Sequence, residues 1–180
     1  HSLRLYERLG AELNFNVMLR QDGLISLAHS HHDMELARRW VNAIRMNGVD
    51  AEMLTEPQIR HRVPLLNRNA RYPVLGGFIQ PRAGISRHDA VVWGLARAAS
   101  AHGVDIVQGC EVRDFRKDGD RVIGVETSQG TVNCDRVVMS VSNHSSVLAG
   151  LAGFTLPITT MTLQAMVSEP IKPVLDPVVI

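Results

Sequence analysis

The sequence predicts a mixed α/β and α+β protein whose chain enters and leaves two domains more than once. Two observations lead to this class. In the middle of the chain, apolar residues at three- and four-residue steps over 89–102 indicate a helix with one buried face, and the apolar run at 104–107 indicates a buried strand after it. On both sides of this helix-to-strand crossover, alternating segments separated by Gly, Asn and Asp indicate antiparallel hairpins.

The first part of the chain alternates between helical and strand periodicities. Asp22-Gly23 is the strongest hairpin signal, Asn47-Gly48 closes a helix, and Thr55-Glu56-Pro57 has the cap-then-proline form of a helix start. The expected elements, in chain order, are a helix at 2–14, a hairpin over 17–27, a helix at 33–46, a strand at 49–54, a short helix at 58–63 and a strand at 74–79.

The second part of the chain combines the central helix with a β-meander. Gly103 ends the helix, and the segments 117–120 and 129–130 supply the turns of the meander. The expected elements are a helix at 89–102, a strand at 104–107, strands at 111–115, 121–127 and 131–133 continued at 137–141, a helix from Ser145 or Ser146 through Ala152, and a strand at 156–167.

Composition excludes several classes of partner. Lysine and arginine total 19 against 18 acidic residues, so no net field selects nucleic acid or an anionic membrane. No apolar run approaches the roughly 20 residues of a membrane span. Cys110 and Cys134 lack metal-ligand spacing, so we expect both side chains to be buried as small hydrophobic residues. Two free cysteines also suit a reducing compartment, and we expect a cytoplasmic protein. The chain starts inside an amphipathic helix without Met, so we expect a piece of a larger protein.

His88 is the strongest candidate for chemistry because it stands at the entrance of the central helix. Free backbone N–H groups and the positive end of the helix dipole favour a neutral imidazole and attract anions such as phosphate. A nucleophilic or phosphate-adjacent role competes here with a simple capping or surface role. Metal binding by His29, His31 and His32 needs convergence on one point, and a solvated helix cap explains them better. No phosphate-binding glycine loop is present.

Two long segments carry a resemblance to a known family. They read GGFIQPRAGISRHDAVVWGLARAASAHGVDIVQGCEVRDF and RVIGVETSQGTVNCDRVVMSVSNHSSVLAGLAG. The sequence resembles the FAD-dependent amine and amino-acid oxidoreductases of the D-amino-acid oxidase type over essentially its whole length. Within that family it is most similar to the β subunits of heterotetrameric sarcosine oxidases, and SRHDAVVWG carries most of this similarity.

The resemblance implies a division into parts of two domains. Residues 1–73 correspond to a portion of the antiparallel-sheet substrate domain. Residues 74–153 correspond to a portion of the Rossmann-like FAD-binding domain with its β-meander, and residues 154–180 return to the substrate domain. The Rossmann glycine loop and the residues that grip the substrate carboxylate lie outside the chain, so no catalytic residue is assigned within it.

The resemblance also implies the cofactor contacts. His88 carries covalently attached FMN through the flavin 8α carbon, and Val112, in a buried strand, contacts noncovalent FAD through its backbone. Arg87 pairs with phosphate or reduced flavin, or remains a solvated residue at the helix start. One departure is the stretch 140–143, which reads SVSN where many relatives have an Ala-Ala-Gly-like stretch near the flavin.

The implied activity is the oxidative demethylation of sarcosine at FAD, with electrons passing to FMN and then to O2. The products are glycine, hydrogen peroxide and either formaldehyde or methylenetetrahydrofolate. The implied partners are the other subunits of the heterotetramer, one of which binds tetrahydrofolate. Any NAD is also expected on a partner subunit. Two alternatives remain open: a single-flavin amine or glycine oxidase or dehydrogenase of the same family, and a noncatalytic scaffold domain.

Overall fold

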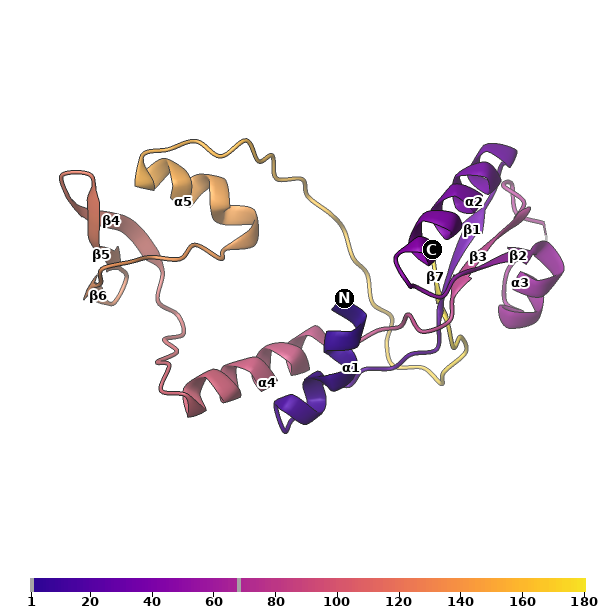
Figure 1. The fold of residues 1–180 in the computed structure, drawn as a ribbon, viewed down its shortest axis with the longest axis horizontal. Coiled ribbons are helices and arrows are strands. Elements are labelled where there is room, and N and C mark those ends of the chain that lie inside the picture. The colour runs from indigo at the N-terminus through magenta and orange to yellow at the C-terminus, as the bar shows by residue number, and fades with distance from the viewer. Residues whose placement is uncertain (1, 68) are drawn as a thin grey trace. The chain divides into compact units, whose positions relative to one another are not determined.

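The computed structural model describes residues 2–67 and 69–180, which divide into two compact units (Figure 1). The first unit comprises His1–Val104 with Pro170–Ile180, and the second comprises Asp105–Glu169. Each unit contains its own sheet, so the predicted class of a mixed α/β and α+β protein is confirmed. Within the described ranges, no helix is both long and apolar enough to cross a membrane.

The first unit is built on a four-stranded sheet in the order β2-β3-β1-β7. β3 pairs antiparallel with both β1 and β2, whereas β7 pairs parallel with β1. The elements of this unit are α1 (Ser2–Glu12), β1 (Leu24–Ala28), α2 (His31–Met46), β2 (Glu52–Thr55), α3 (Glu56–Arg62), β3 (Gly76–Gln80), α4 (His88–Ala101) and β7 (Val178–Val179).

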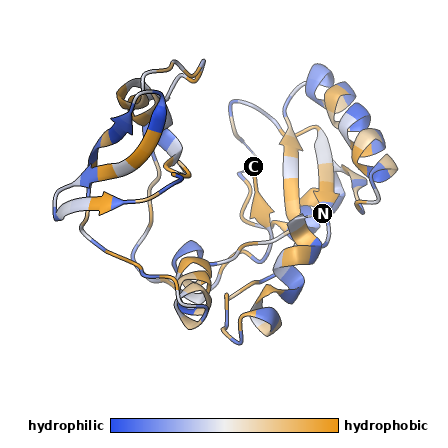
Figure 2. Cartoon of the chain, turned by 60° about the vertical axis from the view of Figure 1, so that its left-hand side comes forward, coloured by the Kyte–Doolittle hydropathy of each residue, from blue (hydrophilic) through white to orange (hydrophobic). Residues whose placement is uncertain are grey.

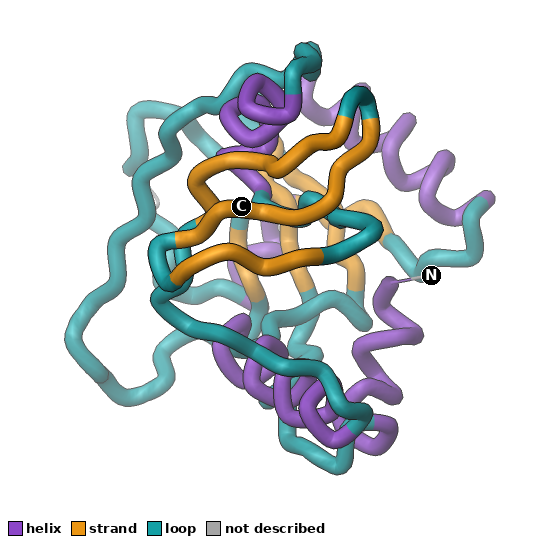
Figure 3. The backbone as a smooth tube through the Cα atoms, turned by 90° about the vertical axis from the view of Figure 1, so that its left-hand side faces the viewer, coloured by secondary structure: helices purple, strands orange, loops and turns teal. Residues whose placement is uncertain are grey.

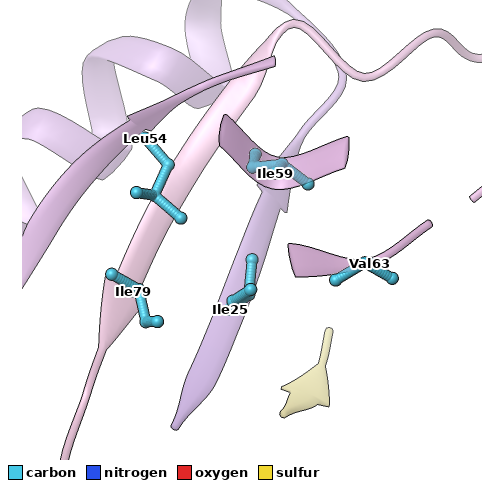
Figure 4. Packing of buried hydrophobic residues seen from close by; sticks show 5 residues of the cluster. All are labelled: Ile25, Leu54, Ile59, Val63 and Ile79. Carbon is cyan, nitrogen blue, oxygen red and sulfur yellow. The ribbon is translucent and has the colours of Figure 1, made fainter. Parts of the chain in front are cut away.

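Helices α2 and α3 cover opposite faces of this sheet. Phe78 and Ile79 are neighbours in β3, so their side chains point to opposite faces. Phe78 packs with Ala37 and Val41 of α2. Ile79 belongs to a cluster that includes the fully buried Ile59 of α3, and Figure 4 shows this cluster: Ile25, Leu54, Ile59, Val63 and Ile79. Helices α1 and α2 carry both hydrophilic and hydrophobic residues (Figure 2).

The second unit is a three-stranded antiparallel meander accompanied by one α-helix (Figure 3). Its elements are β4 (Val112–Asp118), β5 (Arg121–Thr127), β6 (Gly130–Asn133), the 3-10 turn Ser142–His144 and α5 (Ser145–Ala152). Phe115 and Val125 face each other in register and are both buried. The Lys117 ammonium donates a hydrogen bond to the carbonyl of Ala152, which ties the end of α5 to the meander. The predicted meander is therefore confirmed.

The predicted hairpin over 17–27 is wrong. Gly23 does adopt a positive φ of 93°, but the chain after it pairs elsewhere. Both edges of β1 are occupied, one by β3 and the other by β7, so no edge is left for residues 17–21. Arg20 instead forms an isolated antiparallel bridge with Ile85.

Three other predicted strands, at 104–107, 137–141 and 156–167, are not strands. A strand needs the backbone of a neighbour, and apolar spacing cannot supply one. The side chains of Val104, Ile106 and Val107 are 52%, 47% and 61% exposed, so α4 does not lead into a buried strand. The cysteines expected to be buried, Cys110 and Cys134, are half-buried.

The unit boundaries do not coincide with the domain portions expected at 1–73, 74–153 and 154–180. The chain passes from the first unit to the second after Val104 and returns at Pro170. The division into compact units shows which residues pack together, but it does not show which of them bind substrate or cofactor. The assignment of those roles therefore remains a prediction.

Candidate functional site

His88 is the first residue of α4, and its side chain is exposed. Arg87 is the N-cap with extended backbone angles, and its side chain makes no capping hydrogen bond. Among the described residues, no hydrogen bond or ion pair involves the His88 ring, so both ring nitrogens are open to a ligand. The predicted position of this histidine at a helix entrance is thereby confirmed, whereas its role remains a prediction.

The residues on either side of His88 form an ion pair with each other. The Arg87 guanidinium donates from Nε to Asp89 Oδ1 at 3.1 Å and from Nη2 to Oδ2 at 2.6 Å, and Oδ1 also accepts the Ala90 N–H at 2.8 Å. The bond from Arg87 is the main cause that lowers the pKa of the Asp89 carboxyl. Any contact of Arg87 with a flavin or phosphate must therefore share the guanidinium with Asp89.

A backbone bridge holds the segment that leads into His88. The Arg20 N–H donates to the Ile85 carbonyl at 2.8 Å, and the Ile85 N–H donates to the Arg20 carbonyl at 2.9 Å. Gly84 makes this approach possible. A Cβ there would overlap the Arg20 carbonyl oxygen and lie 2.8 Å from the Gln21 Cα. Only glycine therefore fits at position 84 without displacing the backbone.

A polar clamp joins the same segment to α1. The Arg82 Nη2 donates to both oxygens of Glu7, at 2.6 and 2.7 Å, and the Gln21 amide donates to Glu7 at 3.0 Å. The hydrogen bond from Arg82 is the main cause that lowers the pKa of the Glu7 carboxyl, and the Gln21 bond adds to it. The Gln21 amide also donates to the Arg82 carbonyl at 2.6 Å. Side chains far apart in sequence thus hold the approach to His88.

The buried face of α4 packs against α1 and the chain that follows it. Val91 forms a cluster with Leu9 and Val17. One turn further along, a Cβ at Gly94 would lie 3.0 Å from the Phe15 ring and 3.1 Å from the Leu13 side chain. The direction of the helix that begins at His88 is therefore fixed by apolar packing.

Val112 is the first residue of β4, an edge strand of the meander in the second unit. The Ser128 N–H donates to the Glu111 carbonyl at 2.8 Å, and the Glu111 N–H donates to the Ser128 hydroxyl oxygen at 3.0 Å, so these two residues face each other at a hydrogen-bonded position. Such pairs alternate along an antiparallel ladder, so the next pair, Val112 and Thr127, turns the backbone N–H and C=O of Val112 away from β5. Its side chain is 37% exposed, which corrects the expectation of a buried strand. The outward backbone groups fit the predicted contact with FAD.

A pocket of about 550 Å³ lies beside this outward edge, entirely within the second unit. Its walls combine the start of β4 with the apolar side of α5. The lining residues are Cys110, Glu111, Val112, Arg113, Val141, His144, Val147, Leu148 and Leu151. Sequence reasoning did not identify Cys110 and His144 as neighbours of Val112, since no local pattern brings residues 110 and 144 together.

The histidine cluster at the start of α2 is part of a helix cap. The Ser30 hydroxyl accepts the Asp33 N–H at 3.1 Å, and the Asp33 carboxylate accepts the His29 N–H at 3.1 Å. The His29 ring lies 3.2 Å from the carbonyl of Tyr72. In the described part of the chain, no three His, Cys, Asp or Glu side chains are grouped so that they could hold a metal ion. The cap hydrogen bonds at this helix start are thus made by Ser30 and Asp33, with the His29 backbone as a donor, and not by the histidine rings.

Comparison with known proteins identifies the family of this chain. The sequence profile described as "FAD dependent oxidoreductase" matches residues 1–179, almost the entire length. The chain belongs to the FAD-dependent oxidoreductase family. FAD is accordingly the cofactor of this family.

Two relatives and one solved structure illustrate the match. The chain is 49% identical over 176 residues to "Sarcosine oxidase subunit beta" of Rhodobacter capsulatus, covering 97% of this chain and 42% of that protein. It is 46% identical over 179 residues to the protein of the same name from Rhizobium meliloti, covering 99% of this chain and 43% of that protein. The chain thus spans less than half the length of these relatives.

The structural match concerns the fold. The crystal structure of L-proline dehydrogenase from P. horikoshii matches with a TM-score of 0.81 and 20% identity, covering 99% of this chain and 47% of that one. At this identity the match supports the predicted oxidoreductase fold and carries no information on substrate.

Proposed function

We propose that this chain is part of the flavin-carrying subunit of an oxidase that oxidatively demethylates sarcosine to glycine. The observation that carries the proposal is the 46–49% identity to three proteins named "Sarcosine oxidase subunit beta" over 96–99% of this chain. In this proposal, residues 1–73 and 154–180 are portions of the substrate domain and residues 74–153 are a portion of the FAD-binding domain. The subunit works in a cytoplasmic heterotetramer.

FAD in this proposal is held partly by the second unit. Val112 offers an outward N–H donor and C=O acceptor at a sheet edge, which suits the hydrogen-bonding edge of a heterocycle. In the adjoining pocket of about 550 Å³, apolar side chains of α5 would contact the rest of this heterocycle. FAD supplies the chemistry that accepts the electron pair of the amine substrate. The phosphate-binding glycine loop belongs to a part of the protein beyond this chain.

His88 is the proposed attachment point of a covalent FMN. Its imidazole is exposed at the N-terminus of α4, and among the described residues no hydrogen bond engages either ring nitrogen, so a ring nitrogen is available to bind a flavin. Asp89 and Arg87 neutralise each other, so the ring stands between two charges that are already paired. A flavin held at His88 would supply the chemistry that passes electrons from FAD on to O2, giving hydrogen peroxide, and its covalent attachment would prevent its loss.

The partners in this proposal are the remaining subunits, for which the name "subunit beta" of the relatives is the support. One partner brings tetrahydrofolate, which takes up the methyl carbon as methylenetetrahydrofolate. Without tetrahydrofolate, that carbon leaves as formaldehyde. NAD, where present, is placed on a partner subunit and not on this chain.

The test replaces His88 by Asn in the intact complex and uses His102→Asn as a matched control. His102 is an exposed histidine at the other end of the same helix. We expect acid-precipitated protein to lose one flavin in His88→Asn and to keep it in His102→Asn. FAD reduction by sarcosine should persist in stopped-flow absorbance traces, whereas oxidase turnover should collapse.

Mass spectrometry of the tryptic peptide 88–97 gives the direct measurement. An unmodified peptide in active wild-type complex, with flavin released by acid, would favour the single-flavin oxidase or dehydrogenase instead. Purified intact protein that binds no flavin would favour the noncatalytic scaffold. Either outcome contradicts the proposal.

A further inference from the structure

Positive charge is concentrated in one stretch of the chain. Residues 57–88 contain six arginines and no aspartate or glutamate. The other 148 residues contain 13 basic and 18 acidic residues, so the nearly neutral total of the chain conceals a strong asymmetry. A surface that carries such an excess of one charge attracts partners of the opposite charge.

Three of the six arginines are already neutralised by carboxylates of this chain. The ion pairs are Arg60 with Glu56, Arg82 with Glu7, and Arg87 with Asp89. Arg68 lies outside the described residues. Among the described residues, no carboxylate forms an ion pair with Arg62 or Arg71, and both side chains are exposed. These two arginines are therefore available to carboxylates of another molecule.

The two available arginines lie at the end of α3 and in the loop that follows it. Val63 and Val74 pack in one hydrophobic cluster, so the core holds both ends of this loop. The Tyr72 carbonyl lies 3.2 Å from the His29 ring, which ties the loop to the chain before α2. The loop therefore presents its exposed side chains from an anchored backbone. We call residues 60–73 the basic loop surface.

Exposed apolar and aromatic side chains accompany the arginines on the basic loop surface. Leu65 is 67% exposed, Tyr72 is 64% exposed, and the Arg71 guanidinium lies 5.6 Å from the centre of the Tyr72 ring. Arginine and tyrosine are enriched in protein–protein interfaces, where they supply much of the binding energy. A phosphate backbone would meet the arginines but leave Leu65 exposed. The combination therefore favours a protein partner that surrounds apolar residues with carboxylates.

We propose that the basic loop surface docks against an acidic surface of another subunit of the complex. The inference rests on the proposed function, because the partner subunits belong to that proposal. In the docked state, carboxylates of the partner accept charge-assisted hydrogen bonds from Arg62 and Arg71. Apolar side chains of the same partner cover Leu65 and Tyr72, which removes their exposed area from water.

The first test identifies the partner of the arginines by carbodiimide cross-linking of the intact complex. The double variant Arg62→Lys/Arg71→Lys keeps both charges and supplies amines, which carbodiimide joins to a carboxylate in direct contact. The chain has only two other lysines, Lys117 and Lys172, so few cross-links from them compete. We expect mass spectrometry to find the new lysines joined to Asp or Glu of another subunit. A link only to the same subunit, or no link at all, overturns the proposal.

The second test measures assembly of the intact complex by sedimentation at several salt concentrations. We expect Arg62→Glu/Arg71→Glu to raise the dissociation constant about tenfold or more at low salt and to remove most of its salt dependence. Arg39→Glu is the matched control, because Arg39 is an exposed arginine of α2 outside the basic loop surface, and assembly should not change. Equal assembly of the double glutamate variant and the wild type overturns the docking surface. A wild-type protein that assembles with no other subunit instead overturns the proposed function.

Discussion

Replacing Gly84 by Ala should open the bridge that holds the approach to His88. The added Cβ would overlap the Arg20 carbonyl oxygen and lie 2.8 Å from the Arg20 carbonyl carbon and the Gln21 Cα, all of which are backbone atoms that cannot rotate away. The two backbone segments must therefore separate, and the pair of hydrogen bonds between Arg20 and Ile85 is lost. At about 0.5–1.5 kcal/mol net for each bond, the local opening free energy should fall by about 2 kcal/mol.

Hydrogen exchange measured by mass spectrometry on the intact protein tests this prediction. A fall of about 2 kcal/mol should make the amides of Arg20 and Ile85 exchange about 30-fold faster. Gly150→Ala is the control, because a Cβ at this helical glycine meets nothing within 4 Å. That change should be neutral or stabilise α5 by up to about 1 kcal/mol. Unchanged exchange at Arg20 and Ile85 in Gly84→Ala would refute the reasoning.

Three further predictions concern the clamp, the sheet edge and the core. Because Arg82 lowers the pKa of Glu7, the clamp should stabilise the fold above the ordinary glutamate pKa of 4.5, and this contribution should be lost as the pH falls through the lower folded value. Glu7→Gln should remove that pH dependence, which urea midpoints at acidic and neutral pH would show or disprove. Val112→Pro removes the backbone N–H donor and should reduce the FAD content of the intact protein, whereas Val112→Ile keeps the donor and should keep the FAD content. Equal FAD content in the two variants would exclude the backbone contact. Ile59 is fully buried, so Ile59→Ala should lower the free energy of unfolding by about 2–5 kcal/mol, measured by thermal or urea unfolding. Ile158 is 51% exposed, so Ile158→Ala should have little effect, and equal losses of stability in the two variants would contradict the packing.

Helices were predictable because their determinants lie within a few residues. The apolar spacing and the Ser30 cap place α2 within two residues of its observed start, and its predicted end at Met46 is correct. The strand predicted at 121–127 coincides with β5, since alternation and the flanking turns are also local. The strand predicted at 104–107 fails because a strand depends on a partner backbone, which apolar spacing does not provide.

The candidate site, too, could be predicted from the sequence only in part. The position of His88 at a helix entrance could be predicted from sequence because helix starts depend on local spacing. Its ion-paired neighbours, Arg87 and Asp89, are only two residues apart, but their bond depends on side-chain conformations that a pattern does not specify. The assignment of flavin to this histidine came from the resemblance and not from the spacing.

By itself, the sequence determined the helices, the meander, the family and the residue that begins α4. Only the tertiary structure decided that Gly84 lies against Arg20, that Arg82 pairs with Glu7 and that Tyr6 lines a pocket beside the segment before His88. These contacts join residues more than 60 positions apart, and periodicity reports only which face of an element is apolar. Which apolar faces meet, and which backbones approach closely, depends on how the whole chain packs into a dense interior.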